Sequence, residues 1–353
     1  MALAGTSVVA LLSWFAAAAV ATAASIEWLI RWAIRRDLLD HPNHRSSHDV
    51  PTPRLGGVGI ACVLLGGLAW LALRSPEAGH GHALLTLVVL GLVVAALSLY
   101  DDVRSVAPPY RLAAHVVVAV SLVWTVGTVG TVAGGALGRV TLTAPWAGVL
   151  TALWVVSLIN AFNFVDGIDG MAGAQAAVAA LGWVVLGSAT GNATLVTAGV
   201  LLLAAAAGFL WHNWSPARIF MGDGGSALLG FLLATVPWVI GGPELWLPSV
   251  CLLWPVLLDT GWTLVTRAWH GLPVWESHRM HIYQKLVDAG HSPARVSLAY
   301  AAASGCGVVI AWMTLRAEAM ALLVGAAALV GFVAMTASGL RWRVASAAGG
   351  RKG

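Results

Sequence analysis

The stretch NAFNFVDGIDGMAG, residues 160–173, lies between two long apolar runs and concentrates polar side chains where a membrane-spanning helix should end. Its polar residues are Asn160, Asn163, Asp166 and Asp169. A glycine directly follows each aspartate, which favours an irregular turn over a continuous helix. Such a cluster either binds the polar head of a ligand or caps two helices. Capping needs only one or two of these residues, so the sequence favours a ligand site.

The composition around this stretch is that of an integral membrane protein. Only 10% of the residues are charged and 59% are hydrophobic, whereas soluble domains have about 25% charged residues. Apolar runs close to the ~20 residues that span a bilayer recur along the whole chain. We therefore expect an all-α, polytopic helical bundle that forms one transmembrane domain over residues 1–353. About eleven helices are predicted, at roughly 5–33, 55–74, 83–100, 112–133, 147–160, 171–188, 193–211, 225–240, 248–267, 296–315 and 319–338.

The distribution of lysine and arginine predicts the orientation of these helices. Arg74, Arg139 and Arg316 fall on one side, which leaves 16 of the 19 basic residues on the other. Cytoplasmic loops carry the excess of basic residues, so we expect a periplasmic N-terminus and a cytoplasmic C-terminus. The first 25 residues end in ATAAS, as a secretory signal can, but the apolar run continues to Ile30 and no basic residue precedes it. A retained helix is expected there.

The acidic residues gather on the predicted cytoplasmic side. The loops that we expect to be catalytic lie at about 34–54, 101–111, 160–171, 212–225 and 267–295. Asp101 and Asp102 close the third predicted helix, where adjacent side chains point about 100° apart and can serve different partners. The alternative is a solvated helix end that Arg104 balances. In FMGDGGS, residues 220–226, glycines allow a ligand to approach and Asp223 can hold a hard cation; the alternative is a capped turn.

Two basic loops complete the polar set. HPNHRSSHDVPTPRLGGVGI, residues 41–60, contributes three histidines and two arginines. WESHRMHIYQKLVDAGHS, residues 275–292, has basic side chains on an expected short helix. Charged loops are often merely solvated. Here the cationic groups accompany several carboxylates, which predicts a diphosphate site with a metal ion. Mg²⁺ suits such a site because it prefers few carboxylates plus phosphate oxygens.

Five motifs in order, between about residues 38 and 295, resemble the polyprenyl-phosphate N-acetylhexosamine-1-phosphate transferases, glycosyltransferase family 4. They are PTPRLGGVGI, YDD, NAFNFVDGIDGMAG, FMGDGGSALLG and HRMHIYQ. The resemblance implies an EC 2.7.8 phosphoglycosyltransferase that moves a sugar 1-phosphate from a UDP-N-acetyl sugar to undecaprenyl phosphate and releases UMP. It also implies Mg²⁺, or Mn²⁺, as cofactor. The expected location is the bacterial inner membrane, with the active site facing the cytoplasm. The expected partners are the lipid bilayer and a second copy of the chain in a homodimer, and no nucleic acid is expected to bind.

The same resemblance implies roles for individual residues of the catalytic set. Asp223 is expected to bind the metal ion, with Asp102 as a second ligand. Asp101 and Asp102 match an aspartate pair, one of which is proposed as the base for the lipid phosphate. Asp166 and His281 complete the set, and His281 matches the first histidine of an HxHH motif near the diphosphate.

The implied substrate-binding residues surround the nucleotide and the diphosphate. Asn163 and Asp169 match residues around the nucleotide, with Asp169 near the uracil edge. Phe220 matches an aromatic residue that stacks on uracil, which π-stacking favours. The basic residues of this set are Arg45, His48, Arg54, His278 and Arg279.

The chain departs from the family pattern at two motifs. A third carboxylate of DDxxD is missing after Asp102, and Tyr283 and Gln284 replace two histidines of HxHH. The HxYQ variant resembles the branch that starts O-antigen chains for lipopolysaccharide in cell-wall biogenesis. The expected sugar is then N-acetylfucosamine, N-acetylquinovosamine or GlcNAc.

A membrane transporter is the alternative function. Its ionisable residues should lie near the bilayer midplane, often in internal repeats. Here only Glu27 and Asp259 fall within a predicted span, and no repeat is visible. The transferase is therefore favoured, and another lipid-linked transferase with a different nucleotide sugar is the second alternative.

Overall fold

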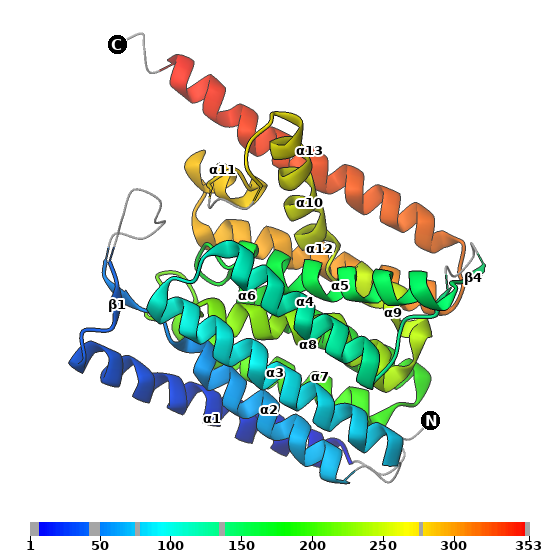
Figure 1. The fold of residues 1–353 in the computed structure, drawn as a ribbon. Helices are drawn as coiled ribbons and strands as arrows, with labels where there is room; N and C mark the ends of the chain where they lie inside the picture. The colour runs from blue at the N-terminus through cyan, green and yellow to red at the C-terminus, as the bar shows by residue number, and fades with distance from the viewer. Residues whose placement is uncertain (1–6, 42–49, 75–77, 134–137, 275–277, 350–353) are drawn as a thin grey trace.

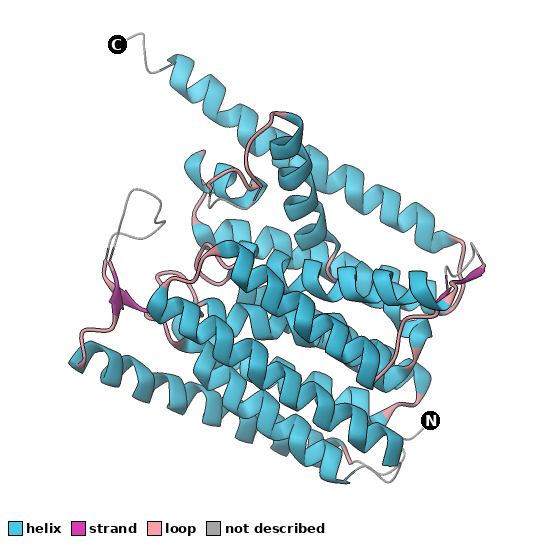
Figure 2. Ribbon diagram, viewed as in Figure 1, coloured by secondary structure: helices cyan, strands magenta, loops and turns pink. Residues whose placement is uncertain are grey.

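The chain is described by a computed structural model that places residues 7–41, 50–74, 78–133, 138–274 and 278–349. Helices make up most of this described part, and most of them run side by side in one bundle (Figures 1 and 2). The expected all-α, multi-pass membrane fold is confirmed.

The chain order of elements follows the predicted pattern closely. The helices are α1 (Val8–Arg35), α2 (Gly56–Arg74), α3 (Ala78–Arg104), α4 (Pro108–Thr125), α5 (Ala144–Val165), α6 (Met171–Thr190), α7 (Ala193–Asn213), α8 (Asp223–Gly241), α9 (Trp246–Leu252), α10 (Trp254–Trp269), α11 (Ile282–Asp288), α12 (Pro293–Leu315) and α13 (Met320–Gly349), with a 3-10 turn η2 (Pro243–Leu245) before α9. Two small antiparallel hairpins pair β1 (Leu39–Asp40) with β2 (Thr52–Pro53) and β3 (Thr131–Ala133) with β4 (Arg139–Thr141).

Each predicted helix overlaps a helix of the structure, but the number of membrane spans stays a prediction. Within the described ranges, nine helices are long and apolar enough to cross a bilayer. The pair formed by η2–α9 and α10 makes a tenth if it counts as one span. Helix α4 is not among them.

Two predicted helices are wrong in extent. The helix expected over 112–133 ends at Thr125, because Gly127 adopts a φ of +114° and the chain then enters β3. The helix expected over 248–267 is broken between α9 and α10 by a bend of 73°. Pro255 lies in the first turn of α10, where it has no amide hydrogen to continue the α9 ladder.

A third correction concerns the stretch that opened the sequence analysis. Helix α5 continues to Val165 rather than ending near residue 160, so Asn160 and Asn163 lie on a helix. Only the segment after Val165 forms the turn that the glycines predicted, and Gly170 adopts a φ of +77° there.

Helix α8 lies in the middle of the bundle, against α3 and α5 (Figure 1). Its residues are apolar on all sides, as expected for a helix that is buried on all sides. It crosses α2 at a glycine contact, where a Cβ on Gly57 would lie 2.3 Å from the Cα of Gly225. This close approach brings the first residues of α2 and α8 to the same end of the bundle, and it positions the site described next.

Candidate active site

The turn before α8 places Asp223 at the start of the central helix. Gly222 has a φ of +78°, and a Cβ there would lie 2.9 Å from both the backbone oxygen of Arg54 and Oδ2 of Asp102. Only glycine fits this position without strain. The turn therefore packs directly against the end of α3 and against the segment before α2.

Asp102 is not a solvated helix end, and that alternative is wrong for this residue. Its Oδ1 accepts a hydrogen bond from the amide of Asp223 and its Oδ2 from the amide of Gly224, both at 3.1 Å. The side chain is only 6% exposed. Asp102 thus caps the N-terminus of α8 from another helix, since these amides have no partner within α8.

Two arginines connect the aspartates. Arg54 places Nε 3.4 Å from Oδ1 of Asp102 and Nη2 3.1 Å from Oδ1 of Asp223. Arg111 places Nη1 against Oδ2 of Asp101 and 3.4 Å from Oδ2 of Asp223. Asp101 also accepts a hydrogen bond from the amide of Val106 at 2.6 Å. We call Asp101, Asp102, Asp223, Arg54 and Arg111 the arginine–aspartate cluster.

The cluster is held on the side of Arg54 by backbone pairing. The amide of Phe220 donates to the oxygen of Pro53 at 2.8 Å, and the amide of Gly56 donates to the oxygen of Phe220 at 2.9 Å. Burial disfavours the charge on Arg54, but Asp223 and Asp102 outweigh it and raise the pKa of the guanidinium above its usual value. Arg54 is therefore a permanent cation at Asp223.

Asp166 and Asn163 approach the cluster from the end of α5. Burial raises the pKa of Asp166 well above its usual range; Arg54 opposes this effect, and Asp223 and Asp102 add to it. Asn163 donates to Oγ of Ser226 in the first turn of α8 at 3.0 Å. The end of α5 thus packs beside the start of α8, and a cavity of about 40 Å³ between them is lined by Asp101, Arg111, Asn160, Asn163 and Asp223.

Asp169 makes contacts that fix the loop after α7. Its Oδ2 accepts from the amide of Ala217 at 3.0 Å, and its backbone oxygen accepts from Oγ of Ser297 at 2.8 Å. Oδ1 of Asn213, a residue that sequence reasoning missed, accepts a hydrogen bond from the amide of Gly170 at 2.9 Å. Asp169 and Phe220 are both partly exposed, and their roles at the nucleotide stay predictions.

His281 belongs to a second cluster and contacts none of the five residues of the arginine–aspartate cluster directly. Its Nδ1 lies 3.1 Å from Oδ1 of Asp259, a fully buried residue of α10. Its ring lies 5.9 Å from the ring of Phe164 at the end of α5. Phe164 also lines the cavity beside Asp223. His281 and Asp259 thus form a second cluster, which lies against Phe164 at the end of α5.

The short helix expected to carry the last basic motif is smaller than predicted. Helix α11 begins at Ile282, so His278 and Arg279 precede it and His281 is its N-cap residue. Arg279 pairs with Asp288 at 2.9 Å. Burial, together with His281 and Arg267, lowers the pKa of His278 to about 4. His278 is therefore neutral at pH 7 and supplies no positive charge.

Tyr283 and Gln284, which replace two family histidines, have structural contacts in this chain. The hydroxyl of Tyr283 donates to the oxygen of Phe164 at 2.8 Å, and Oε1 of Gln284 accepts from the amide of His281 at 3.2 Å. A Cβ on Gly167 would lie 2.1 Å from the Tyr283 hydroxyl. The variant motif thus docks α11 on the turn after α5. Arg45 and His48 lie outside the described residues.

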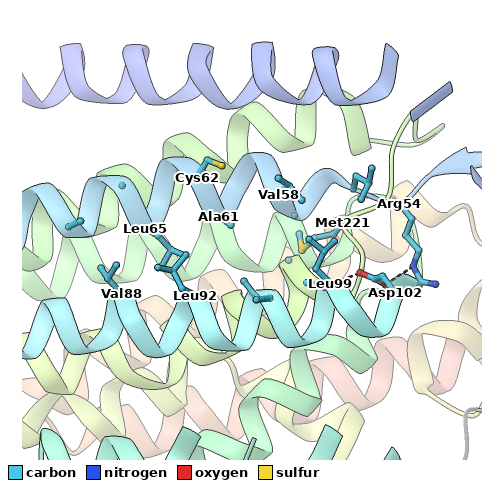
Figure 3. Close-up of a pocket in the computed structure, with 18 residues that line it drawn as sticks. Arg54, Val58, Ala61, Cys62, Leu65, Val88, Leu92, Leu99, Asp102 and Met221 are labelled. Carbon is cyan, nitrogen blue, oxygen red and sulfur yellow. Dashed lines mark hydrogen bonds and ion pairs between the residues drawn. The ribbon is translucent and has the colours of Figure 1, made fainter. Parts of the chain in front are cut away.

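Two apolar grooves run along the bundle to the arginine–aspartate cluster. One, of about 460 Å³, lies between α2 and α3 and ends at Arg54 and Asp102 (Figure 3). The other, of about 530 Å³, lies between α4, α5 and α10 and includes Arg111 and Asn160 in its lining. The charged groups therefore lie where an apolar chain and a polar head can be bound together.

Among the described residues, no group of three or more His, Cys, Asp or Glu side chains is arranged as a metal site. Three carboxylates, those of Asp101, Asp102 and Asp223, nevertheless pair with only two arginines, and the raised pKa of the neighbouring Asp166 shows that a further negative charge there is not compensated. A cation with few protein ligands fits this excess of negative charge.

Comparison with known proteins agrees with this architecture. Residues 84–240 match the model of "Glycosyl transferase family 4". A decaprenyl-phosphate N-acetylglucosaminephosphotransferase of Mycolicibacterium smegmatis is 30% identical over 80% of this chain and 76% of its own length. An undecaprenyl-phosphate alpha-N-acetylglucosaminyl 1-phosphate transferase of Yersinia pestis is 28% identical over 89% and 87%. A probable undecaprenyl-phosphate N-acetylglucosaminyl 1-phosphate transferase of Bacillus subtilis is 25% identical over 74% and 73%.

The matched region contains the end of α3, the start of α4 and the start of α8, which supply four of the five residues of the arginine–aspartate cluster; Arg54 lies outside it. The chain belongs to glycosyl transferase family 4, the polyprenyl-phosphate N-acetylhexosamine-1-phosphate transferases.

Proposed function

We propose that this transferase moves an N-acetylhexosamine 1-phosphate from a UDP-sugar to undecaprenyl phosphate and releases UMP. The observation that carries the proposal is the bridging of Asp101, Asp102 and Asp223 by Arg54 and Arg111 at the ends of two apolar grooves. Phosphoryl transfer depends on positioning and on neutralising phosphate charge. A cluster of alternating cations and carboxylates supplies both.

The acceptor lipid is proposed to lie in the groove between α4, α5 and α10. Arg111 lines this groove and also contacts Asp101 and Asp223. A phosphate at the end of a chain in this groove would meet the guanidinium of Arg111, which binds phosphate in a fixed geometry. Asp101 then holds Arg111 and is the candidate for accepting or orienting the acceptor proton.

Mg²⁺ is proposed as the cofactor, with Asp223 as its principal ligand. Asp223 is 21% exposed, whereas both oxygens of Asp102 already accept amides of α8. Asp102 is therefore better placed to hold Asp223 in position than to act as a metal ligand by itself. Its Oδ1 also pairs with Arg54. When bound, the ion would neutralise charge on the donor diphosphate. Mg²⁺ commonly uses one or two carboxylates plus substrate phosphates, so a larger set of protein ligands is not required.

The donor is proposed to bind at Asn163, Asp166, Asp169 and Phe220, on the side of the cluster formed by the turns before α6 and α8. The names of the relatives favour GlcNAc over N-acetylfucosamine or N-acetylquinovosamine as the sugar. The cytoplasmic orientation of this end in a bacterial inner membrane is supported by the basic loops that surround it. The homodimer and the O-antigen branch stay predictions.

The test is a transfer assay with the purified chain in detergent or nanodiscs. UDP-GlcNAc and a panel of other UDP-N-acetyl sugars are supplied with undecaprenyl phosphate and Mg²⁺, and released UMP and lipid-linked product are measured. We expect UMP to form only when acceptor lipid and a divalent cation are both present. No activity with any UDP-sugar, together with solute flux in liposomes, would instead establish the transporter.

A further inference from the structure

Asp259 is a carboxylate inside the apolar helix α10, with no exposed surface. Burying a carboxylate costs several kcal/mol unless hydrogen bonds compensate for the lost water. Five donors surround it: Nδ1 of His281 (3.1 Å), the amides of Ile282 (2.9 Å) and Tyr283 (3.1 Å), and the hydroxyls of Tyr300 (2.6 Å) and Thr263 (3.3 Å). Both oxygens of the buried carboxylate therefore accept hydrogen bonds, from α10, from the start of α11 and from α12.

The two oxygens of Asp259 divide these donors in a way that fixes α11. Oδ1 accepts from the His281 ring and from the amide of Ile282, and Oδ2 accepts from the amide of Tyr283. Ile282 and Tyr283 are the first two residues of α11, whose N-cap residue is His281. One carboxylate therefore holds the backbone at the start of α11 and the imidazole ring beside it.

This contact also decides which nitrogen of His281 carries a proton. An ionised carboxylate only accepts hydrogen bonds, so Nδ1 of His281 must be the donor. Nε2 is then the nitrogen that can meet a substrate. The ring cannot turn away easily, because it stacks on Tyr283 at 5.6 Å with an angle of 20° and lies against Phe164.

We propose that Asp259 is a positioning residue for the transfer reaction: it holds His281 in the Nδ1–H form beside Phe164, which lines the cavity next to Asp223, and leaves Nε2 as the nitrogen that acts on the donor. A buried acid that fixes the tautomer and direction of an imidazole is a recurring catalytic device. The inference rests on the proposed function for its substrate. The tautomer itself is a property of the chain alone and can be measured without activity.

The kinetic test is a double-mutant cycle on kcat with Asp259→Asn, His281→Ala and the pair. If Asp259 acts through His281, Asp259→Asn lowers kcat by about 10²-fold, within the range for a positioned proton-transfer group, with little change in KM for the UDP-sugar. The double variant should then be no slower than His281→Ala, since residues that act as one unit are not additive. A further loss of kcat from Asp259→Asn in the His281→Ala background would overturn the proposal.

A matched control separates positioning from packing. Tyr300→Phe removes a hydrogen bond to the same carboxylate, at Oδ2, and leaves the His281 contact at Oδ1 in place. We expect a lower melting temperature with kcat retained. A loss of kcat equal to that of Asp259→Asn would mean that any weakening of this buried network slows the enzyme, and the positioning role would be rejected.

A measurement on the unaltered protein covers the case in which Asp259→Asn does not fold. ¹⁵N NMR of histidine-labelled protein, recorded where the His281 ring is neutral and assigned by the loss of a signal in His281→Asn, reports the tautomer. The Nδ1–H form is expected, and the Nε2–H form would overturn the inference. Failure of the wild-type transfer assay would instead reject the proposed function, so the two failures are distinguishable.

Discussion

Asp102, near the end of α3, accepts the backbone amide of Asp223, the first residue of α8, at 3.1 Å. Two acidic side chains are thereby held close together, because one of them is bound to the backbone of the other. Arg54 lies against both carboxylates and reduces their repulsion. This relationship fixes the first turn of the central helix α8 against the end of α3.

Replacing Asp102 by alanine should destabilise the protein through the loss of the cap on α8. An N-cap acceptor contributes about 1 kcal/mol, with a range of roughly 0.5–2, so a lower melting temperature in detergent is expected. Thr143→Ala is the matched control, since Thr143 is the N-cap residue of α5 but makes no side-chain cap hydrogen bond. Equal melting temperatures for Asp102→Ala and Thr143→Ala would contradict the capping role.

Asp223→Asn should nearly abolish turnover. Loss of one carboxylate from the proposed metal site removes several kcal/mol of charge stabilisation, or a factor of about 10² or more in kcat. Steady-state UMP release at saturating Mg²⁺ measures the effect. Asp288→Asn serves as the control. It removes the last acid of α11, which pairs with Arg279, and should keep normal turnover. Near-normal turnover of Asp223→Asn would count against the metal-binding role.

Phe220→Ala should raise KM for the UDP-sugar with a smaller change in kcat. Aromatic stacking contributes about 0.5–1.5 kcal/mol, which corresponds to roughly a 2- to 10-fold increase in KM. The backbone pairing with Pro53 and Gly56 does not involve the side chain, so the turn before α8 should persist. Phe220→Trp keeps an aromatic face and should restore KM. An unchanged KM in the alanine variant would argue against stacking.

Gly261→Leu should fill the proposed acceptor groove. Gly261 lines that groove, and a Cβ there would meet no atom within 4 Å. KM for undecaprenyl phosphate should rise by about tenfold, equal to 1.4 kcal/mol, while KM for the UDP-sugar stays the same. Gly305→Leu on α12 is the control, because its Cβ is equally unobstructed and it does not line this groove. A similar effect of both variants, or of neither, would show that the acceptor binds elsewhere.

Much of the helical framework could be predicted because hydropathy is a local property. An apolar run of sufficient length must form a helix in lipid, where each backbone amide needs a partner within its own segment. The same reasoning overlooked the break between α9 and α10. Pro255 was visible in the sequence, but proline within an apolar run also occurs in helices that remain continuous.

The candidate site was predicted in part. Asp101, Asp102 and Asp223 do meet, and the glycines of the FMGDGGS motif are required by the close contacts at Gly222 and Gly225. Arg111 was not expected in the site, because a single arginine after two prolines has no distinctive spacing. Asp259 was noticed only as an acid within a span. An intramembrane acid signals function, yet its partner His281 lies 22 residues further along the chain.

Composition and hydropathy are enough to identify this chain as a helical membrane protein with acidic and basic groups concentrated on one set of loops. The pairing of those groups depends on the folded chain: Asp102 pairs with the backbone of α8, Arg54 and Arg111 with Asp223, and Asp259 with His281. The difference arises from the range of the interactions. Burial of an apolar run depends on neighbours along the chain, whereas a hydrogen bond or ion pair depends on atoms within about 3–4 Å, and helix packing alone brings those atoms together.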